Sequence, residues 1–420
     1  MSEYFNSDTL SNCLKKIIDY RGKTPKKLGG DWSNSGYRAI SANNVKFEGL
    51  AKLVDIRYLD EALYLKWMKD EIHRGDILLT SEAPAGQAMV WDSDEKIVLS
   101  QRLYGLRVKD HINNRYLKYY LQSQTGQSEI FKNNSGSTVF GISAITFDHI
   151  TIRYPDIIAQ EKISSALHAL DAKIEHNNRA NTELESMAKT LYDYWFMQFD
   201  FPGESGHPYK SSGGRMVWNE GLNREIPEGW YDSNILAVAD LLGGGTPNKN
   251  KSEYWQGDIP FFTPTEANSE IFKLTTEQHI TDVGLKNCNS PLFEIGTIFI
   301  TARGSVGKLM INARKMAMNQ SCYALSGKGS TGQAFLYFKT KELIHHLQVK
   351  SSGSVFNSIV GNDIKFTSLA IPSEVVIEKY SQIAEPIFDQ ILSNTKQNAE
   401  LSGLRDWLLP MLMNGQVRVN

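Results

Sequence analysis

Apolar residues recur at alternating spacings of three and four positions in two long segments, residues 156–200 and residues 373–414. This spacing aligns them in one stripe along an α-helix, so we predict a long helix in each segment. Pro386 lies in the second stripe and lacks a backbone donor, so a kink is expected there. The first stripe contains Ile163, Leu167, Leu170, Ile174, Asn177, Asn181, Leu184, Ala188, Leu191 and Trp195. The second contains Tyr380, Ala384, Ile387, Ile391, Asn394, Asn398, Leu401, Leu404 or Arg405, Leu408 and Leu412.

Two asparagines lie in the middle of each stripe. A buried asparagine costs stability unless its amide finds a partner, and at such a position it can fix the register of paired helices. Antiparallel packing of the two helices would pair Asn177 with Asn398 and Asn181 with Asn394. Its one poor position sets Arg405 against a leucine. A parallel arrangement also matches the asparagines, and each helix could instead pack only on its own domain.

The chain contains the same series of motifs twice. The asparagine segment IEHNNRANTEL (174–184) recurs as ILSNTKQNAEL (391–401), and the apolar run GDILLT (75–80) recurs as GTIFIT (296–301). Three further pairs keep the same order: GKTP (22–25) with GGTP (244–247), SQRLYGL (100–106) with NQSCYAL (319–325), and SGS (135–137) with SGS (352–354). The repeat is too long for a solenoid, so it indicates a duplicated domain. Its short β-type runs are separated by Gly, Asn, Ser and Pro clusters.

These patterns together predict an α+β fold with two tandem mixed α/β domains. The first domain would cover residues 1–155 and be followed by its helix over 156–200. A connector rich in Gly, Pro and Ser would cover residues 201–230. The second domain would cover residues 231–372 and be followed by its helix over 373–414. The two helices would pack as an antiparallel coiled coil.

Composition restricts the class of protein. Of the 420 residues, 41% are hydrophobic and 22% are charged, which is ordinary for a soluble globular protein. Cys13, Cys288 and Cys322 are scattered, which favours a reducing compartment over a disulfide framework or a zinc site. No signal peptide or membrane span is evident, so a cytoplasmic location is expected. A net charge of −2 means that binding of nucleic acid would depend on local patches or on a partner.

The sequence contains no convincing catalytic motif. The segment GSVGK (304–308) resembles a phosphate-binding loop, but Ala302 and Leu309 stand where Gly and Ser or Thr are needed. The Asn/Asp-Pro-Pro-aromatic motif of an adenine methyltransferase is absent. His345 and His346 have no nearby carboxylate or cysteine cluster. We therefore predict a non-catalytic protein without a metal or cofactor.

Polar loops in equivalent places of the two copies are the candidate recognition residues. A rigid helical pair between similar domains suits a ligand with two features at a fixed distance, and bipartite DNA is such a ligand. Lys and Arg can contact phosphates, Asn reads adenine, and Glu accepts from cytosine. Glu82 aligns with Arg303, a charge difference expected of domains that read different half-sites, although solvated surface charge would look the same. The candidate DNA contacts are Lys23, Lys26, Lys27, Arg38, Asn43, Asn44, Arg102, Lys249, Lys251, Thr265, Glu266, Arg303, Ser305, Lys308 and Gln320.

The duplicated order of motifs resembles the specificity subunit of type I restriction–modification systems over essentially the full chain. The motifs LYDYWF (191–196) and SSGGRMVWNEGLNREIPEGW (211–230) add to this resemblance. It implies two target-recognition domains, each reading one half of a split site in double-stranded DNA. It also implies two modification subunits that methylate adenine with S-adenosylmethionine, and restriction subunits that cleave DNA using ATP. The rival hypotheses are a duplicated interaction scaffold without DNA specificity and a degenerate nuclease or methyltransferase.

Overall fold

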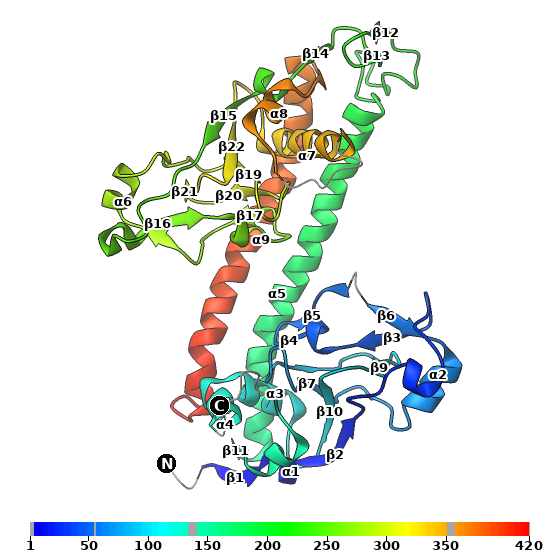
Figure 1. The fold of residues 1–420 in the computed structure, drawn as a ribbon, viewed down its shortest axis with the longest axis vertical. Helices are drawn as coiled ribbons and strands as arrows, with labels where there is room; N and C mark the ends of the chain where they lie inside the picture. Colours follow the sequence, from blue (N-terminus) through cyan, green and yellow to red (C-terminus); the bar gives the residue numbers. More distant parts are fainter. Residues whose placement is uncertain (1–3, 54–55, 133–140, 351–357, 420) are drawn as a thin grey trace. The chain divides into compact units, whose positions relative to one another are not determined.

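The computed structural model describes residues 4–53, 56–132, 141–350 and 358–419, and the two SGS motifs lie outside these ranges. The chain forms two compact units. Unit 1 combines Met1–Glu175 with Ala399–Asn420, and unit 2 is His176–Asn398. The division falls inside both long helices, α5 (Ile157–Tyr192) and α9 (Glu374–Met413), so each unit contains part of each helix (Figure 1).

Unit 1 is built on two small sheets. Its antiparallel four-stranded sheet has the order β2 (Leu14–Asp19), β10 (Leu103–Val108), β7 (Ile77–Thr80), β8 (Ala88–Val90). Its three-stranded sheet has the order β6 (Arg57–Leu59), β3 (Tyr37–Ile40), β9 (Val98–Leu99), and β3 and β9 run parallel. The other strands pair as β1 (Asn6–Thr9) with β11 (Thr151–Tyr154) and β4 (Val45–Lys46) with β5 (Gly49–Leu50). The helices are α1 (Leu10–Cys13), η1 (Lys26–Leu28), η2 (Ala42–Asn44), α2 (Glu61–Trp67), α3 (Asn114–Gln122), α4 (Gln124–Phe131) and η4 (Ala144–Asp148).

Unit 2 repeats this plan with one more strand. Its five-stranded sheet has the order β15 (Ala239–Gly243), β22 (Cys322–Gly327), β19 (Ile298–Thr301), β20 (Leu309–Asn312), β17 (Phe272–Lys273). Its three-stranded sheet is β18 (His279–Ile280), β16 (Trp255–Phe262), β21 (Ala317–Met318), with β16 and β21 parallel. β14 (Tyr231–Ser233) pairs with β23 (Leu369–Ile371). The shorter helices are the π-helix η5 (Asp193–Met197), η6 (Ile235–Ala237), η7 (Ser252–Tyr254), η8 (Pro264–Glu266), α6 (Asp282–Lys286), α7 (Gln333–Lys350) and α8 (Gly361–Phe366).

Each larger sheet has two buried faces because its side chains alternate between two clusters. In unit 1, Ile77 and Leu79 of β7 pack in a cluster with residues of α3 and the long helices, whereas Leu78 between them packs with residues of α2. In unit 2, Ile298 and Ile300 of β19 likewise lie in the cluster that contains α7, while the intervening residue lies in a separate cluster. This double burial explains why the motifs GDILLT and GTIFIT are almost continuously apolar.

The long helices run antiparallel within unit 2. Asn177 Nδ2 donates to Asn398 Oδ1 at 2.9 Å, and Asn394 Nδ2 donates to Asn181 Oδ1 at 2.8 Å. These are the two pairs that antiparallel packing predicts. Asn177 is almost fully buried, and Gln397 also accepts from it at 2.8 Å, so both N–H donors of its side-chain amide are used. α9 continues as one helix through Pro386.

Unit 1 contains a charged cluster at the position where the sequence predicts a mismatch. Arg405, rather than the exposed Leu404, takes the inward position, and its Nη1 donates to Asp171 Oδ1 at 3.0 Å. Asp171 Oδ2 also accepts from Tyr119 Oη at 2.6 Å and Lys118 Nζ at 3.3 Å. Burial would raise the pKa of Asp171, but these donors outweigh it and hold the pKa below its usual value. The expected poor contact is therefore a buried ion cluster, because α3 supplies partners that helix periodicity does not reveal.

The connector between the two copies is structured. It contains a hairpin of β12 (Met216–Asn219) and β13 (Arg224–Pro227). Aromatic rings anchor its ends, since Phe201 stacks on Trp230 with centroids 5.4 Å apart and Phe199 meets Trp230 edge-on at 5.4 Å. In the part of the chain that the structure describes, no helix is both long and apolar enough to cross a membrane.

Candidate nucleic-acid interface

The turn that follows β7 and the turn that follows β19 have the same backbone hydrogen bonds. The Thr80 amide donates to the Gln87 carbonyl at 2.8 Å, and the Thr301 amide donates to the Lys308 carbonyl at 3.0 Å. A glycine closes each turn, Gly86 in unit 1 and Gly307 in unit 2, and both have a φ above +80°. Residues other than glycine rarely adopt this conformation, so the turn favours glycine there. Each threonine Oγ1 accepts from the amide after that glycine, at 2.9 Å in both units. The two turns are therefore one scaffold with different exposed side chains.

The short helices η2 and η8 lie beside these turns. The two short helices are equivalent because they share a backbone hydrogen bond. In η2 the Asn44 amide donates to the Ser41 carbonyl at 2.9 Å, and in η8 the Glu266 amide donates to the Thr263 carbonyl at 3.0 Å. Asn43 and Thr265 occupy the exposed positions of these helices.

Asn44 and Glu266 are buried, which corrects the expectation that they present their side chains to DNA. The Asn44 amide accepts from the Ser41 amide at 3.0 Å and donates to the carbonyls of Ala51 and Lys52. Glu266 accepts from the Glu277 amide at 2.8 Å and pairs with Lys273 at 3.3 Å. Both side chains hold their own loop in shape, so we no longer count them as base contacts.

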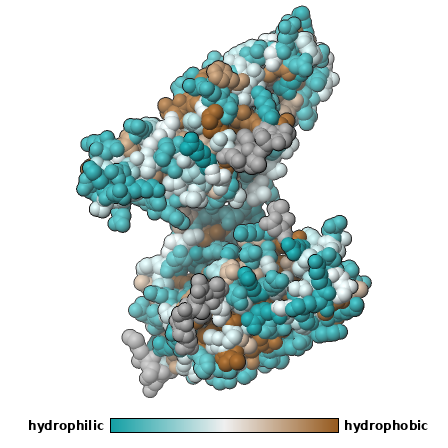
Figure 2. Space-filling view, viewed as in Figure 1, coloured by the Kyte–Doolittle hydropathy of each residue, from teal (hydrophilic) through white to brown (hydrophobic). Residues whose placement is uncertain are grey.

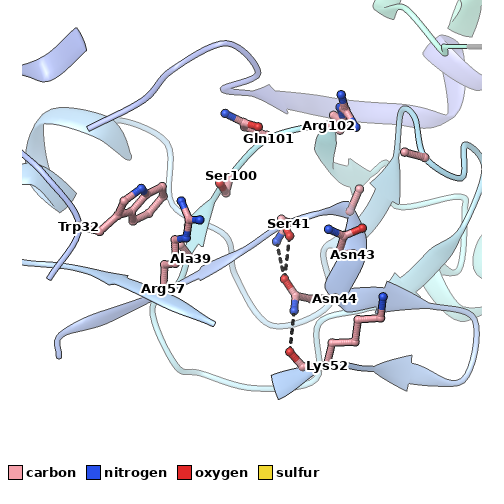
Figure 3. A pocket seen from close by; sticks show the side chains of 12 residues that line it. Trp32, Ala39, Ser41, Asn43, Asn44, Lys52, Arg57, Ser100, Gln101 and Arg102 are labelled. Atoms are coloured by element: carbon pink, nitrogen blue, oxygen red, sulfur yellow. Dashed lines mark hydrogen bonds between the residues drawn. The ribbon is translucent and has the colours of Figure 1, made fainter. Parts of the chain in front are cut away.

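A polar cleft of about 370 Å³ opens beside η2 in unit 1 (Figure 3). Several segments distant in sequence form it, and two of them are joined where the amide of Ala42 donates to the carbonyl of Gln101 at 3.3 Å. Among the candidate contacts, Asn43, Asn44 and Arg102 line the cleft. The lining contains three cations and several amides and hydroxyls but no carboxylate. The lining residues are Trp32, Ala39, Ser41, Ala42, Asn43, Asn44, Lys52, Arg57, Ala83, Ser100, Gln101 and Arg102.

Arg102 lies at the rim of this cleft in an unusual backbone conformation. Its φ is 62°, in the left-handed region that non-glycine residues seldom occupy. Its Nε lies 3.2 Å from Oε2 of Glu82, and both side chains are substantially exposed. An exposed pair of this kind contributes at most about 1 kcal/mol, so a ligand can replace either partner.

The equivalent rim of unit 2 has a different charge. Arg303 takes the place of Glu82, and Ser321 takes the place of Arg102. Matching hydrogen bonds establish this: the Ser81 amide donates to the Arg102 carbonyl, and the Ala302 amide donates to the Ser321 carbonyl, both at 2.9 Å. Arg303 and Ser305 are exposed. The neutral pair of unit 1 is thus replaced by a single positive charge.

Three other candidates lie around the unit 2 rim. Lys308 Nζ donates to the Ala267 carbonyl at 3.1 Å, which ties the turn to η8. Gln320 is exposed and bonded to Thr246. Thr265 Oγ1 lies 2.8 Å from Thr263 Oγ1.

The predicted basic loops are only partly free. Lys23 Nζ donates to the Trp67 carbonyl at 2.9 Å, and burial lowers its pKa. Arg38 forms a two-point ion pair with Glu95, which removes it from the exposed candidates. Lys251 Nζ bonds to Tyr254 Oη at 3.0 Å, and this bond raises its pKa. The exposed candidates in these loops are Lys26, Lys27 and Lys249, with Lys27 Nζ also donating to the Gly22 carbonyl at 2.7 Å.

Most of the lining residues of the cleft were not predicted from the sequence, and those with cationic, aromatic or amide side chains are Trp32, Lys52, Arg57 and Gln101. Arg57 lies over the Trp32 ring at 5.4 Å, and Figure 3 shows both beside Ser100. Gln101 directly precedes Arg102 in the repeated motif SQRLYGL, and this was the available signal.

In the view of Figure 2, hydrophilic side chains also cover the region of α6 and β16 in unit 2.

Two features bear on possible chemistry. The described residues bring together no group of three or more His, Cys, Asp or Glu side chains that could hold a metal ion. Burial raises the pKa of Cys13 and of Cys322 to about 12, so both remain protonated thiols at neutral pH.

Comparison with known proteins places both copies in one family. The model of the type I restriction modification DNA specificity domain matches residues 9–186 and again residues 227–402. The MjaIX specificity subunit of Methanocaldococcus jannaschii is 26% identical over 351 residues, covering 82% of this chain and 78% of that protein. The HindI specificity subunit of Haemophilus influenzae is 24% identical over 404 residues, covering 83% and 88%.

A solved structure has the same fold. The S subunit of a type I restriction–modification system from M. genitalium superposes with a TM-score of 0.58 at 15% sequence identity, covering 97% of this chain and 96% of that one. The two domain matches, in the order that the repeat predicts, account for most of the chain. The chain therefore belongs to the family of type I restriction–modification DNA specificity subunits.

Proposed function

We propose that this specificity subunit reads an asymmetric, bipartite DNA target, with one half read by each recognition domain. The observation that carries the proposal is that both units build the same turn and short helix with the same hydrogen bonds but expose different side chains there. A constant scaffold with different exposed donors and acceptors is what two readers of different sequences require. We assign the two readings to residues 1–155 and 231–372.

The paired helices would set the distance between the two half-sites. α5 and α9 are the segments in which the chain passes from one unit to the other. The bonded asparagine pairs fix the register of the helices, because a slip by one turn would leave four amides without their partners. Residues 156–200 and 373–414 are thus the spacer. Residues 201–230 are the connector between the first copy and the second.

The catalytic work would belong to partners. We propose that two modification subunits, which bind S-adenosylmethionine and methylate adenine, dock on this chain, and that restriction subunits driven by ATP join them. A duplicated chain offers each docking surface twice, which suits two copies of one partner. The chain itself, with a net charge of −2, would rely on these partners for much of its attraction to phosphates. Its free cysteines suit a cytoplasmic location.

Exchange of one domain tests the proposal. The full chain, co-expressed with its modification subunit, would be used to select bound sequences from random DNA. We expect a motif of two specific halves separated by a fixed number of unspecified base pairs. Replacing residues 1–155 with those of a relative should change one half and leave the other intact. Selection of no motif would support a scaffold instead, and a change in both halves would contradict independent reading.

A further inference from the structure

We infer that the rim of the unit 1 cleft is the base-reading site of the first domain, with Arg102 and Glu82 reading a G·C pair and Asn43 and Gln101 reading an A·T pair beside it. This inference rests on the proposed function and assigns it to particular side chains. The Ser81 amide donates to the Arg102 carbonyl, which brings Glu82 beside Arg102, and the Ala42 amide donates to the Gln101 carbonyl, which brings Asn43 beside Gln101.

Backbone conformation singles out this cleft. Among the described residues, six non-glycine residues have a φ in the left-handed region, and three of them, Lys52, Ala83 and Arg102, line the cleft. Each such conformation costs free energy and persists where the surrounding structure imposes it, most often at functional sites. The cluster thus indicates a surface whose shape is maintained for a ligand.

The rim side chains are available to a ligand. Asn43 and Gln101 are exposed, and no other described residue forms a hydrogen bond with either side-chain amide. Among the residues that the structure describes, the side chain of Arg102 has one charged partner, the exposed Glu82. By contrast, the neighbouring Asn44 is fully engaged inside its loop, so it supports the rim without taking part in it.

The available groups match the major-groove edges of two base pairs. Arginine donates twice to O6 and N7 of guanine, and a carboxylate accepts from N4 of cytosine, so Arg102 and Glu82 together complement one G·C pair. An Asn or Gln amide donates to N7 and accepts from N6 of adenine. Lys52 and Arg57, elsewhere in the lining, are cations suited to backbone phosphates.

Unit 2 gives the comparison that makes the assignment specific. At the same scaffold positions it has Arg303 for Glu82, Ser321 for Arg102 and Thr265 for Asn43. Arg303 can read guanine, and Gln320 repeats the amide of Gln101, but this rim lacks the carboxylate of Glu82 and the second amide that Asn43 supplies in unit 1. The two halves of the target should therefore differ at the base pairs that these positions face.

The first test uses single substitutions in the full chain bound to its modification subunit, read by selection from random DNA. Arg102→Ala should reduce discrimination for guanine at one position by about 5- to 150-fold, the range of one good bidentate contact. Asn43→Ala and Gln101→Ala should relax a neighbouring adenine. Arg303→Ala should act in the same way on the other half only.

A matched control removes an equivalent charge from the same domain. Arg74 is exposed and paired with Asp94, and it lies outside the cleft. Arg74→Ala should leave both halves of the motif unchanged. Thermal melting of each variant checks that the exposed substitutions leave the fold intact, whereas Asn44→Ala should lower the melting temperature.

The second test transplants one rim into the other domain. Glu82→Arg combined with Arg102→Ser gives unit 1 the charges of unit 2, and it should change the first half-site while the second stays the same. The inference is overturned if these variants keep the wild-type motif although exchange of residues 1–155 changes it, or if Arg74→Ala changes the motif as much as Arg102→Ala. If the wild-type chain selects no motif, the proposed function fails and the assignment with it.

Discussion

Removal of the Asp171 carboxylate is the sharpest test of the packing in unit 1. This side chain accepts hydrogen bonds from Tyr119 and Lys118 of α3 and from Arg405 of α9. The side chains of Lys118 and Arg405 are only 8% and 10% exposed. Asp171→Ala would leave Lys118 without its carboxylate partner and Arg405 with only the exposed Asp406. Unpaired buried charges are strongly unfavourable because they have lost their hydration.

The size of the effect follows from this burial. Breaking a buried ion pair by removing one partner costs about 3–5 kcal/mol. In a unit of this size, a loss of 1 kcal/mol lowers the melting temperature by about 2–4 °C, so we expect a decrease of at least about 6 °C in the transition of unit 1. Calorimetry would measure the transition, and hydrogen exchange of the α3 backbone would assign it to unit 1.

The effect should also depend on pH. The folded-state pKa of Asp171 lies below its unfolded value, so the carboxylate stabilises the fold above the unfolded pKa of about 4. This contribution is lost as the pH falls from about 4 through the folded pKa. The difference in unfolding free energy between wild type and Asp171→Ala should therefore be constant near neutral pH and shrink in acid.

Asp406 provides the control because it pairs with the same arginine but is 63% exposed. Asp406→Ala should cost at most about 1 kcal/mol. Equal losses of stability in the two variants would refute the reasoning, because they would mean that solvent already screens the charges around Asp171.

Three further predictions concern the long helices and the division of labour. Replacing Asn177 and Asn398 together with leucine should leave the free energy of unfolding equal or higher but allow alternative registers, detected by disulfide cross-linking of cysteines placed across the helices. Asn181–Leu184 in α5 and Ile387–Gln390 in α9 would each be repeated once, which keeps every pair of facing residues between the two helices. The insertion lengthens the helices by about 6 Å and rotates one end by about 40° relative to the other, whereas one base pair of DNA adds about 3.4 Å and 35°. The selected half-sites should then lie one to two base pairs further apart, and an unchanged spacing would show that the helices do not set it. The purified chain alone should neither cut DNA nor transfer labelled methyl groups from S-adenosylmethionine to it, and incorporation of label would contradict a purely recognising role.

The two helices and the matching of their asparagines could be predicted from sequence because one periodic stripe carries that information, but the stripe alone fits a parallel pair as well. Asn177 and Asn181 mark the register, and antiparallel packing is the arrangement in which each meets the other helix's asparagine in reverse order. The duplication predicted equivalent turns for the same reason, since Thr80 and Thr301 end strands of similar sequence.

The candidate site was harder to predict because its residues depend on contacts between distant segments. Arg38 forms an ion pair with Glu95, which lies 57 residues away, and nothing in the sequence near Arg38 reveals that partner. From the sequence, Asn44 is indistinguishable from a base-contacting residue, because the amide that caps a turn and the amide that binds a base are the same chemical group. Only the folded loop shows that its amide is bonded to Ser41. Gln101 gains significance only when its turn meets η2.

The placement of the final helical turns has a consequence for biosynthesis. Leu409, Leu412 and Met413 lie in the same core cluster as Ile163 and Leu167, so the hydrophobic interior of unit 1 is completed by residues of α9 that follow the whole of unit 2 in the sequence. On the ribosome, residues 1–175 emerge long before these side chains are made. The first domain must therefore wait, with part of its core uncovered, through the synthesis of the second. A nonsense codon before Leu409 would therefore damage the recognition domain formed by residues 1–155, although it leaves that domain's own sequence intact.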